Sequence, residues 1–208
     1  MPKKFGENEK QIIVKKLKET GVELFSKYGL KKTSIYDLTS EAEIAQGSFY
    51  NFFDSKEELY FSLLESEEEE MENHMKKIIL NSGSAREAIK ITIVESCSLF
   101  EKTPLLRRIY ESNDYELMVR KLPHEKLLKH QKNDTKLVIN TILKVKTDDE
   151  EITADPEIIS GILRSITLLN LHKKEIGRDI YPEIIEILAE SIADGLVRKT
   201  GQKTTPET

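Results

Sequence analysis

Residues 44–59, IAQGSFYNFFDSKEEL, combine four aromatic side chains with polar side chains that can hydrogen-bond to a partner. Phe49 and Phe53 are four residues apart, so on a helix they share one face and can pack into a core. The polar residues around them, such as Gln46 and Tyr50, cannot all lie on that face. The stretch is therefore either a piece of core or a short helix that packs on one side and offers its other side to a partner.

The rest of the chain contains no pattern that indicates catalysis or metal binding. We find no GxGxxG, P-loop, HExxH, GxSxG or CxxC motif. His124 and His130 are six residues apart and point to different faces of a helix, which makes them a poor ligand pair. His74 follows Glu70 on an acidic face that solvation explains more simply than metal binding. We expect no enzyme activity, no cofactor and no metal.

The composition is typical of a helical protein of the cytoplasm. Hydrophobic residues make up 38% of the 208, enough for a core, and charged residues make up 33%, as in solvated helical proteins. The single cysteine excludes an internal disulfide and fits a reducing compartment. The chain shows neither an apolar signal region nor a run of roughly 18 apolar residues. We therefore expect a cytoplasmic protein with no membrane partner.

The charge is unevenly distributed along the chain. The net charge is −5, yet residues 1–36 hold nine lysines against four glutamates, so this end is cationic and the remainder strongly acidic. One cationic end is the electrostatic pattern of a nucleic-acid-binding module. A solvated basic tail would explain the same charges.

Helical periodicity runs through most of the chain, and strand alternation is nowhere persuasive. The first helix is expected at about Asn8 to Tyr28 and ends at Gly29, and Thr33 is expected to cap a short second helix. The other helices are expected at about 45–52, from 54–55 to 80, 84–100, from 104, 127–145, 156–174 and 182–199, with a polar loop at 146–157. This predicts an all-α protein of about nine helices.

Three short helices at the N-terminus, the last two joined by a turn of about four residues, predict a helix-turn-helix domain followed by a larger helical bundle. In such a unit the second helix of the pair enters the DNA major groove. The expected domains are 1–54 for DNA binding and 55–200 for ligand binding and dimerisation, with a flexible tail at 201–208.

The stretch LFSKYGLKKTSIYDLTSEAEIAQGSFYNFFDSKEEL resembles the DNA-binding domain of the tetracycline-repressor (TetR) family of bacterial regulators. The resemblance covers about residues 12–60 without a gap. Its matching positions are Leu24, Phe25, Gly29, Thr33, Ser34, Asp37, Leu38, Ala42, Gly47, Phe49, Tyr50, Phe53, Ser55, Lys56 and Glu57. The remaining 150 or so residues resemble the family only in the number and length of their helices.

The resemblance implies a role for each matched polar residue. Thr33 and Ser34 would cap the second helix and bind a phosphate, and Lys56 would bind a phosphate at a helix start, where the dipole favours an anion. Gln46 and Ser48 would lie at the groove. The full expected DNA-contacting set is Thr33, Ser34, Tyr36, Ala45, Gln46, Gly47, Ser48, Tyr50, Asn51 and Lys56.

Asn51, which with Tyr50 would contact phosphates, stands where the family usually has His, and two further departures from the family pattern matter more. Glu43 stands where the turn usually has glycine, so a side chain occupies a position that favours positive φ, at about 1 kcal/mol. Ala45 stands where a Ser or Thr usually caps the recognition helix, and loss of such a cap costs about 1 kcal/mol. Glu43 and Ala45 both affect how the recognition helix of this chain would contact DNA bases.

The second domain offers candidates for an effector pocket and a dimer interface. Cys97 lies in a strongly apolar helix, where a buried structural thiol is the simpler interpretation than a redox sensor. Aromatic residues nearby are either core or the wall of a pocket for a mainly apolar effector. The candidate effector residues are Cys97, Phe100, Tyr110, Tyr115, Leu168 and His172. A histidine at a helix end also suits the helix dipole without any ligand.

The helices at 158–171 and 181–197 are the most apolar of the second domain and have more apolar surface than one bundle needs. They either close the monomer's core or, as the resemblance implies, form a four-helix dimer interface. The candidate interface residues are Ile162, Ile166, Leu169, Ile185, Leu188 and Ile192.

Together these features favour a homodimeric regulator, most simply a repressor, that binds a pseudo-palindromic double-stranded DNA operator and is released by a small, mainly apolar effector. The alternative is a helical adaptor that binds a protein partner and binds DNA weakly or without specificity. An all-α enzyme is a third possibility, for which no residue can be nominated as catalyst.

Overall fold

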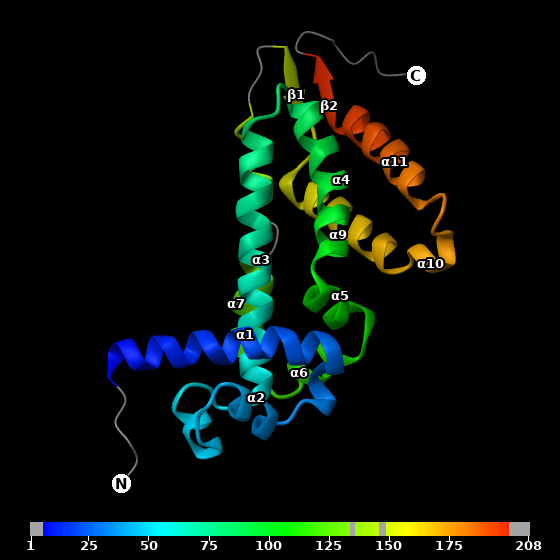
Figure 1. Ribbon diagram of the computed structural model, residues 1–208. Coiled ribbons are helices and arrows are strands. Elements are labelled where there is room, and N and C mark those ends of the chain that lie inside the picture. The colour runs from blue at the N-terminus through cyan, green and yellow to red at the C-terminus, as the bar shows by residue number, and fades with distance from the viewer. Residues whose placement is uncertain (1–5, 134–135, 146–148, 200–208) are drawn as a thin grey trace. The chain divides into compact units, whose positions relative to one another are not determined.

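The computed structural model describes residues 6–133, 136–145 and 149–199 (Figure 1). The described residues form two compact units, one of those within 1–69 and 103–129 and one of those within 70–102 and 130–208. The predicted tail at 201–208 lies outside the described residues. Within the described parts, no helix combines the length and the apolar composition that a bilayer span requires.

The predicted all-α class is confirmed, because almost all the regular structure is helical. The helices are α1 (Glu7–Lys32), α2 (Ile35–Glu41), the 3₁₀ helix η1 (Gln46–Asn51), α3 (Lys56–Leu80), α4 (Ala85–Lys102), α5 (Pro104–Glu111), α6 (Asp114–Val119), α7 (His124–Asn133), α8 (Lys136–Ile142), α9 (Pro156–Leu171), α10 (Lys173–Ile176) and α11 (Tyr181–Leu196). The described residues thus hold more helices than the nine expected, because several predicted helices are divided into shorter ones.

The first unit contains α1, α2, η1, the start of α3, and α5 and α6. Its core is built on aromatic residues: Phe25 and Tyr60 are fully buried with ring centroids 4.6 Å apart. Phe49 and Phe53 are also buried, with centroids 5.8 Å apart, so the predicted inward face of the 44–59 stretch is confirmed. A Cβ at Gly21 would lie 2.9 Å from a methyl of Leu63, so α1 and α3 are in close contact there.

Helix α1 runs beyond its predicted end. Gly29 was expected to terminate the helix and does break it, with φ 79° and ψ 170°, but helical turns resume as far as Lys32. The positive φ is one that glycine adopts without strain. The chain therefore kinks at Gly29 before it enters α2.

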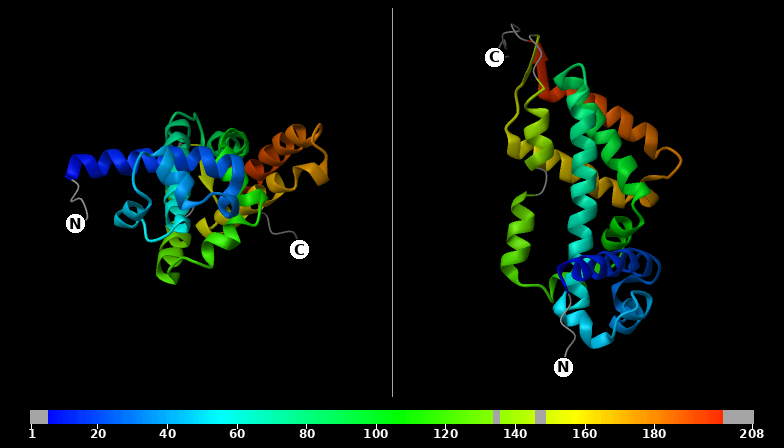
Figure 2. Two further views of the ribbon diagram at one scale, coloured as in Figure 1. Left: turned by 60° about the horizontal axis from the view of Figure 1, so that its bottom comes forward. Right: turned by 60° about the vertical axis from the view of Figure 1, so that its left-hand side comes forward.

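In the second unit, α4 packs against α11 and α9, and Figure 1 and the right-hand view of Figure 2 both show α4 beside α11. The core contains Ile93 and Ile166, among other buried residues from α3, α4, α8, α9 and α11. At the surface, Arg86 of α4 pairs with Glu190 at 2.9 Å and Asp194 at 2.6 Å on α11.

A small antiparallel sheet was not expected from the sequence. Strand β1 (Glu150–Ile152) lies in the segment predicted to be a loop, and β2 (Val197–Lys199) takes the place of the predicted end of the last helix. Ile152 pairs with Val197 and Glu150 with Lys199. Three residues are too few for a period-two pattern to be read, so the pairing depends on contacts 45 or more residues apart along the chain.

Candidate nucleic-acid interface

The start of α2 is closed by a reciprocal cap. The Ser34 hydroxyl accepts the backbone N–H of Asp37 at 3.1 Å, and the Asp37 carboxylate accepts the backbone N–H of Ser34 at 2.9 Å. This is the capping-box arrangement. The Ser34 hydroxyl also donates to the Asp37 carboxylate at 2.6 Å, and this bond, followed by the bond from the Ser34 N–H, holds the pKa of Asp37 below its usual value. Ser34 is the N-cap of α2, so its expected capping role is confirmed, and the residue is exposed.

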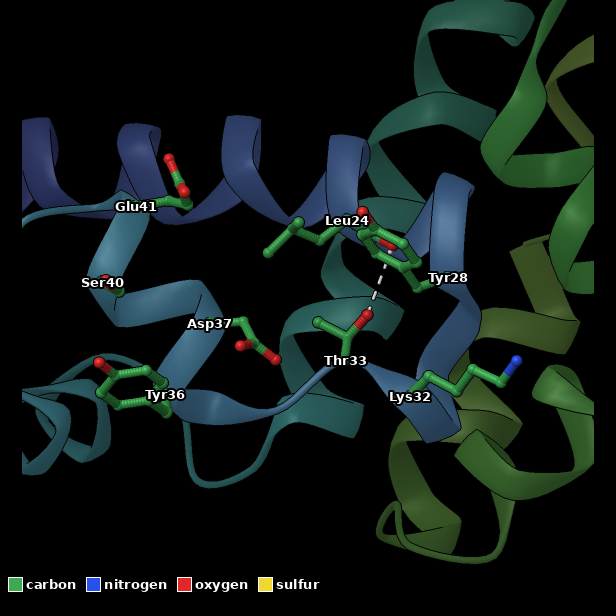
Figure 3. A pocket seen from close by; sticks show the side chains of 8 residues that line it. All are labelled: Leu24, Tyr28, Lys32, Thr33, Tyr36, Asp37, Ser40 and Glu41. Carbon is green, nitrogen blue, oxygen red and sulfur yellow. Dashed lines mark hydrogen bonds between the residues drawn. The ribbon is translucent and has the colours of Figure 1, made fainter.

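Thr33 was expected to cap α2 and bind a phosphate, and the capping role is wrong. The residue is only 2% exposed. Its hydroxyl donates to the carbonyls of Gly29 at 2.9 Å and Leu24 at 3.4 Å, the latter drawn as a dashed line in Figure 3. These bonds close the kinked end of α1, and the phosphate contact of Thr33 stays a prediction.

In the turn before η1, a non-glycine residue has positive φ, as the sequence predicted. Glu43 has φ 59°, which confirms that this position is left-handed. Its carboxylate accepts a hydrogen bond from the ammonium of Lys16 on α1 at 2.6 Å, and this contact lowers the pKa of Glu43. The ion pair offsets the negative charge that Glu43 brings to this surface, although an exposed pair adds little stability.

Gln46 to Asn51 form a 3₁₀ helix and not the α-helix expected. Ala45 precedes it in an extended conformation and offers no side-chain cap, as its sequence predicted. The Ser48 N–H instead donates to the Ala45 carbonyl at 2.8 Å, which tightens the turn. Gln46, Gly47, Tyr50 and Asn51 are exposed and Ser48 is half-buried. A Cβ at Gly47 would meet no atom within 4 Å, so nothing in the described chain requires a glycine there.

The start of α3 is held by a second cap. The Ser55 hydroxyl accepts the Glu58 N–H at 3.1 Å, and the Glu58 carboxylate accepts the Asp54 N–H at 2.7 Å. Glu58 also pairs with Lys126, and this contact is the first cause of its lowered pKa. These bonds fix the place of Lys56, the first residue of α3.

Lys56 is more tightly engaged than its expected role as a phosphate ligand implies. Its ammonium donates to the carbonyls of Leu30 at 2.6 Å and Thr33 at 2.7 Å. An ammonium has three N–H donors. Two of them are therefore used to close the end of α1, and one is left for a ligand.

Two shallow hollows flank α2. The first, of about 440 Å³, gathers four of the expected DNA-contacting residues, because it is lined by Ser34, Ile35, Gln46, Tyr50, Asp54, Ser55, Lys56 and Glu57. The second, of about 400 Å³, is lined by Leu24, Tyr28, Lys32, Thr33, Tyr36, Asp37, Ser40 and Glu41 (Figure 3). Tyr36 is 65% exposed and Tyr50 is 58% exposed, so both phenols are available to a partner.

The six candidate effector residues do not form one site in either unit. Cys97 and Phe100 are buried in the second unit, while Leu168 and His172 there are exposed. Burial is the first cause of the raised pKa of the Cys97 thiol, as a structural thiol requires. In the first unit, Tyr110 and Tyr115 stack with centroids 5.9 Å apart, and the Tyr110 hydroxyl bonds to Glu68 at 3.1 Å.

The structure adds two buried polar groups to the second unit that sequence reasoning missed. The Tyr181 hydroxyl lies beside the Cys97 thiol. Tyr181 is 6% exposed and Asn170 is 4% exposed. Neither the Tyr181 hydroxyl nor the Asn170 side-chain oxygen has a nitrogen or oxygen partner within the described chain. Asn170 continues the buried stripe of Ile159 and Ile166 on α9, and that spacing could have identified it.

The candidate dimer residues are divided between core and surface. Ile166 and Ile185 were expected at the interface, but they are 3% and 4% exposed and belong to the unit's own core. Ile162, Leu188 and Ile192 are partly buried against that core, and Leu169 is 37% exposed. The apolar residues that α9 and α11 leave most exposed are instead Ile158, Leu168 and Ile187.

Comparison with known proteins shows a family match for the N-terminal part of the chain. Residues 17–63 match the model of bacterial regulatory proteins of the tetR family. YuxN, an HTH-type transcriptional regulator of Bacillus subtilis (strain 168), is 41% identical over 58 residues, which are 28% of this chain and only 18% of that protein's length. YezE of the same organism, also an HTH-type regulator, is 25% identical over 148 residues, which are 69% of this chain and 74% of that protein.

Solved structures share the fold over nearly the whole chain. A TetR-family transcriptional regulator from Mesorhizobium loti has a TM-score of 0.70 at 11% identity and covers 92% of this chain and 100% of its own. FadR from Bacillus subtilis, in complex with stearoyl-CoA, has a TM-score of 0.60 at 18% identity and covers 86% of this chain and 95% of its own. The helix-turn-helix of α2 and η1 lies within the match at residues 17–63, so this part of the chain is similar to the tetR family of bacterial regulatory proteins.

Proposed function

We propose that the protein is a homodimeric, ligand-responsive transcriptional regulator that acts as a repressor. Residues 1–54 bind a pseudo-palindromic double-stranded DNA operator through the helix-turn-helix. Residues 55–200 dimerise and bind a small, mainly apolar effector that releases the operator. An effector can do this only if it binds one conformation of the dimer better than the other.

One observation supports DNA binding above the others. The hollow beside η1 brings together Ser34 from the start of α2, Gln46 and Tyr50 from η1, and Lys56 from the start of α3. These residues offer hydroxyl, amide and ammonium donors around one exposed surface. Such donors contact phosphates, and a side chain at the front of the recognition helix can reach base edges. The open side of Gly47 permits close approach of a phosphate backbone.

Selection of bound DNA from a random pool tests the proposal. A pseudo-palindromic sequence with half-sites about one helical turn apart, bound with steep salt dependence, supports a dimeric regulator. A helical adaptor would enrich no sequence and would bind DNA weakly at every salt concentration. That outcome would favour the adaptor.

Gln46→Ala is expected to relax the preference for one base pair in each half-site by about 1–3 kcal/mol without unfolding the domain. Gln46 is exposed at the first position of η1, so its removal leaves the core intact. Affinities are measured for wild type and variant on a set of singly substituted operators, with Gln11→Ala on α1 as the control. If both proteins lose the same affinity at every position, Gln46 does not read a base, and Ser48, Ala45 or Tyr36 must do so.

The exposed apolar side chains of α9 and α11 support the dimer. Leu168 and Ile187 are each 58% exposed. Cβ atoms added at Gly161 and Gly195 would meet nothing within 4 Å, so both helices also have open small-residue positions. Helices with small residues on the exposed side can approach a second copy closely. Stable homodimer interfaces bury on the order of 2,000 Å² or more and are apolar at their centre.

The Asn170 side-chain oxygen, which has no partner within the described chain, and the Tyr181 hydroxyl, which has only the Cys97 thiol beside it, support an effector site in the second unit. A buried polar group without a partner costs about 1–3 kcal/mol. A ligand that supplies a hydrogen-bonding group there would remove this cost, while the neighbouring apolar residues would contact its body. FadR from Bacillus subtilis binds stearoyl-CoA, which has a long apolar chain, so a related fold accommodates an effector of this kind.

Asn170→Leu is expected to stabilise the protein without ligand by about 1–2 kcal/mol, because it replaces the orphaned carbonyl by an apolar side chain with the same number of heavy atoms and the same branching. For a chain of this size the Tm should rise by several degrees. The same variant should lose the Tm increase that an effector from a library of apolar molecules causes in wild type. Asn73→Leu, at an exposed site on α3, is the matched control. A lower Tm for Asn170→Leu would show that the amide is satisfied in the folded protein.

A further inference from the structure

We propose that Asp114 is a positioning residue for the DNA-contacting surface and that it acts on Lys56 through Leu30. This inference rests on the proposed DNA binding, since Lys56 matters to it as a phosphate ligand. Three elements of the first unit meet at Leu30: the kinked end of α1, the first residue of α6 and the first residue of α3.

Asp114 binds the backbone N–H of Leu30. The Leu30 N–H donates to the Asp114 carboxylate at 3.0 Å, although the two residues are 84 positions apart in the chain. The kink at Gly29 makes this contact possible. A Cβ at Gly29 would lie 2.9 Å from the same carboxylate oxygen and would overlap the Arg108 guanidinium, so a larger residue here would displace both side chains and strain the backbone at φ 79°.

Asp114 is itself fixed by two further donors. The carboxylate oxygen that binds Leu30 also accepts the Tyr60 hydroxyl at 3.2 Å and lies 3.5 Å from the Arg108 guanidinium. Asp114 is only 5% exposed, and a buried carboxylate persists only where donors and an opposite charge surround it. Burial, together with the charge of Asp114, raises the pKa of Tyr60, so the phenol stays a neutral donor.

Lys56 binds the backbone carbonyl of Leu30. Its ammonium donates to the Leu30 carbonyl at 2.6 Å and to the Thr33 carbonyl, one residue before the cap of α2. Leu30 is 1% exposed, so its own side chain anchors it in the core. Lys56 also lines the hollow that contains Ser34, Gln46 and Tyr50.

The arrangement links α6 to the proposed DNA surface through one residue. Displacement of the Leu30 backbone would move the acceptor that orients the Lys56 ammonium, and with it the one N–H left for a phosphate. Asp114 therefore acts through Leu30, and no contact between Asp114 and DNA is required.

A double-mutant cycle on operator affinity tests the link. Asp114→Asn keeps the shape of the side chain and removes its charge. It is expected to weaken operator binding about three- to tenfold and to lower the salt slope by about one unit, as Lys56→Met does. In the Lys56→Met background, Asp114→Asn should change affinity less than twofold. Equal losses in both backgrounds would show that Asp114 contributes only to stability. Ser66→Ala, which removes half-buried hydrogen bonds of α3 that do not involve Asp114, Leu30 or Lys56, is the control and should lower Tm but not affinity.

Amide hydrogen exchange of Leu30 tests the same link without DNA and with Asp114 intact. Coupling is reciprocal, so Lys56→Met should speed exchange at the Leu30 N–H about tenfold or more relative to amides in the core of α3. Unchanged Leu30 exchange in Lys56→Met would overturn the proposal even if the protein binds an operator. Faster exchange in a protein that binds no operator would support the link between the residues and reject the proposed DNA binding.

Discussion

Ile187→Glu combined with Leu168→Glu is expected to convert the protein to monomers and to abolish specific operator binding. Both side chains are 58% exposed on α11 and α9, so the substitutions leave the core of the unit intact. In a dimer interface, two carboxylates per protomer would lose solvation without gaining a partner. A monomer contacts one half-site only, and we expect its affinity to fall about 10³-fold or more, toward nonspecific binding.

Sedimentation at micromolar concentration and operator titration measure the two effects. Leu80→Glu is the matched control, because Leu80 is 54% exposed at the end of α3 and is not part of the proposed interface. Ile166 and Ile185 are unsuitable for this test, since both belong to the core and a glutamate there would unfold the unit. A wild-type protein that sediments as a monomer would refute the dimer.

Phe49→Ala is expected to destabilise the helix-turn-helix domain by about 3–5 kcal/mol. Phe49 has no exposed surface, and its ring packs on Phe53 at a centroid distance of 5.8 Å. Loss of the ring removes a large buried area from a small core and leaves a cavity. Because whole domains are stable by only about 5–15 kcal/mol, this change should unfold a large fraction of the domain.

Tyr50→Ala is the matched control for Phe49→Ala. The two aromatic residues are adjacent in η1, but Tyr50 is 58% exposed. Its removal should change stability by less than about 1 kcal/mol and weaken binding to all DNA sequences alike. Chemical denaturation followed by circular dichroism separates the two. A loss of less than about 1 kcal/mol for Phe49→Ala would mean that the core repacks around the gap.

Local features of the helix-turn-helix were predictable from the sequence. The capping box of Ser34 and Asp37 spans three residues, and the Phe49–Phe53 contact spans four. The positive φ of Glu43 followed from the resemblance, because a turn position that usually holds glycine keeps its backbone conformation when another residue occupies it. Interactions between residues three or four positions apart depend on local backbone geometry alone, so they can be predicted from the sequence.

Other features depend on which distant segments meet, and only the tertiary structure decided them. Periodicity predicted that α9 and α11 are strongly apolar, but not that Ile166 and Ile185 face the core while Leu168 and Ile187 face outward. A helix with apolar residues on more than one side has no unique inward face until its neighbours are placed.

The hydrogen bonds that Leu30 makes with Asp114 and Lys56 show most clearly which contacts could not be predicted from the sequence. Nothing near Lys56 in the sequence indicates that its ammonium closes the end of α1, 23 and 26 residues away, and nothing near Asp114 indicates a bond to an amide 84 residues earlier. By itself the sequence determined most of the helical segments, the cap at Ser34 and the aromatic pair of the helix-turn-helix, because those rest on contacts within a few residues. Lys56 and Asp114 meet their partners only when the folded chain brings the ends of α1, α3 and α6 together. Every helix end has unpaired backbone N–H and carbonyl groups, whatever its sequence, so the sequence does not indicate which distant side chain will bind them.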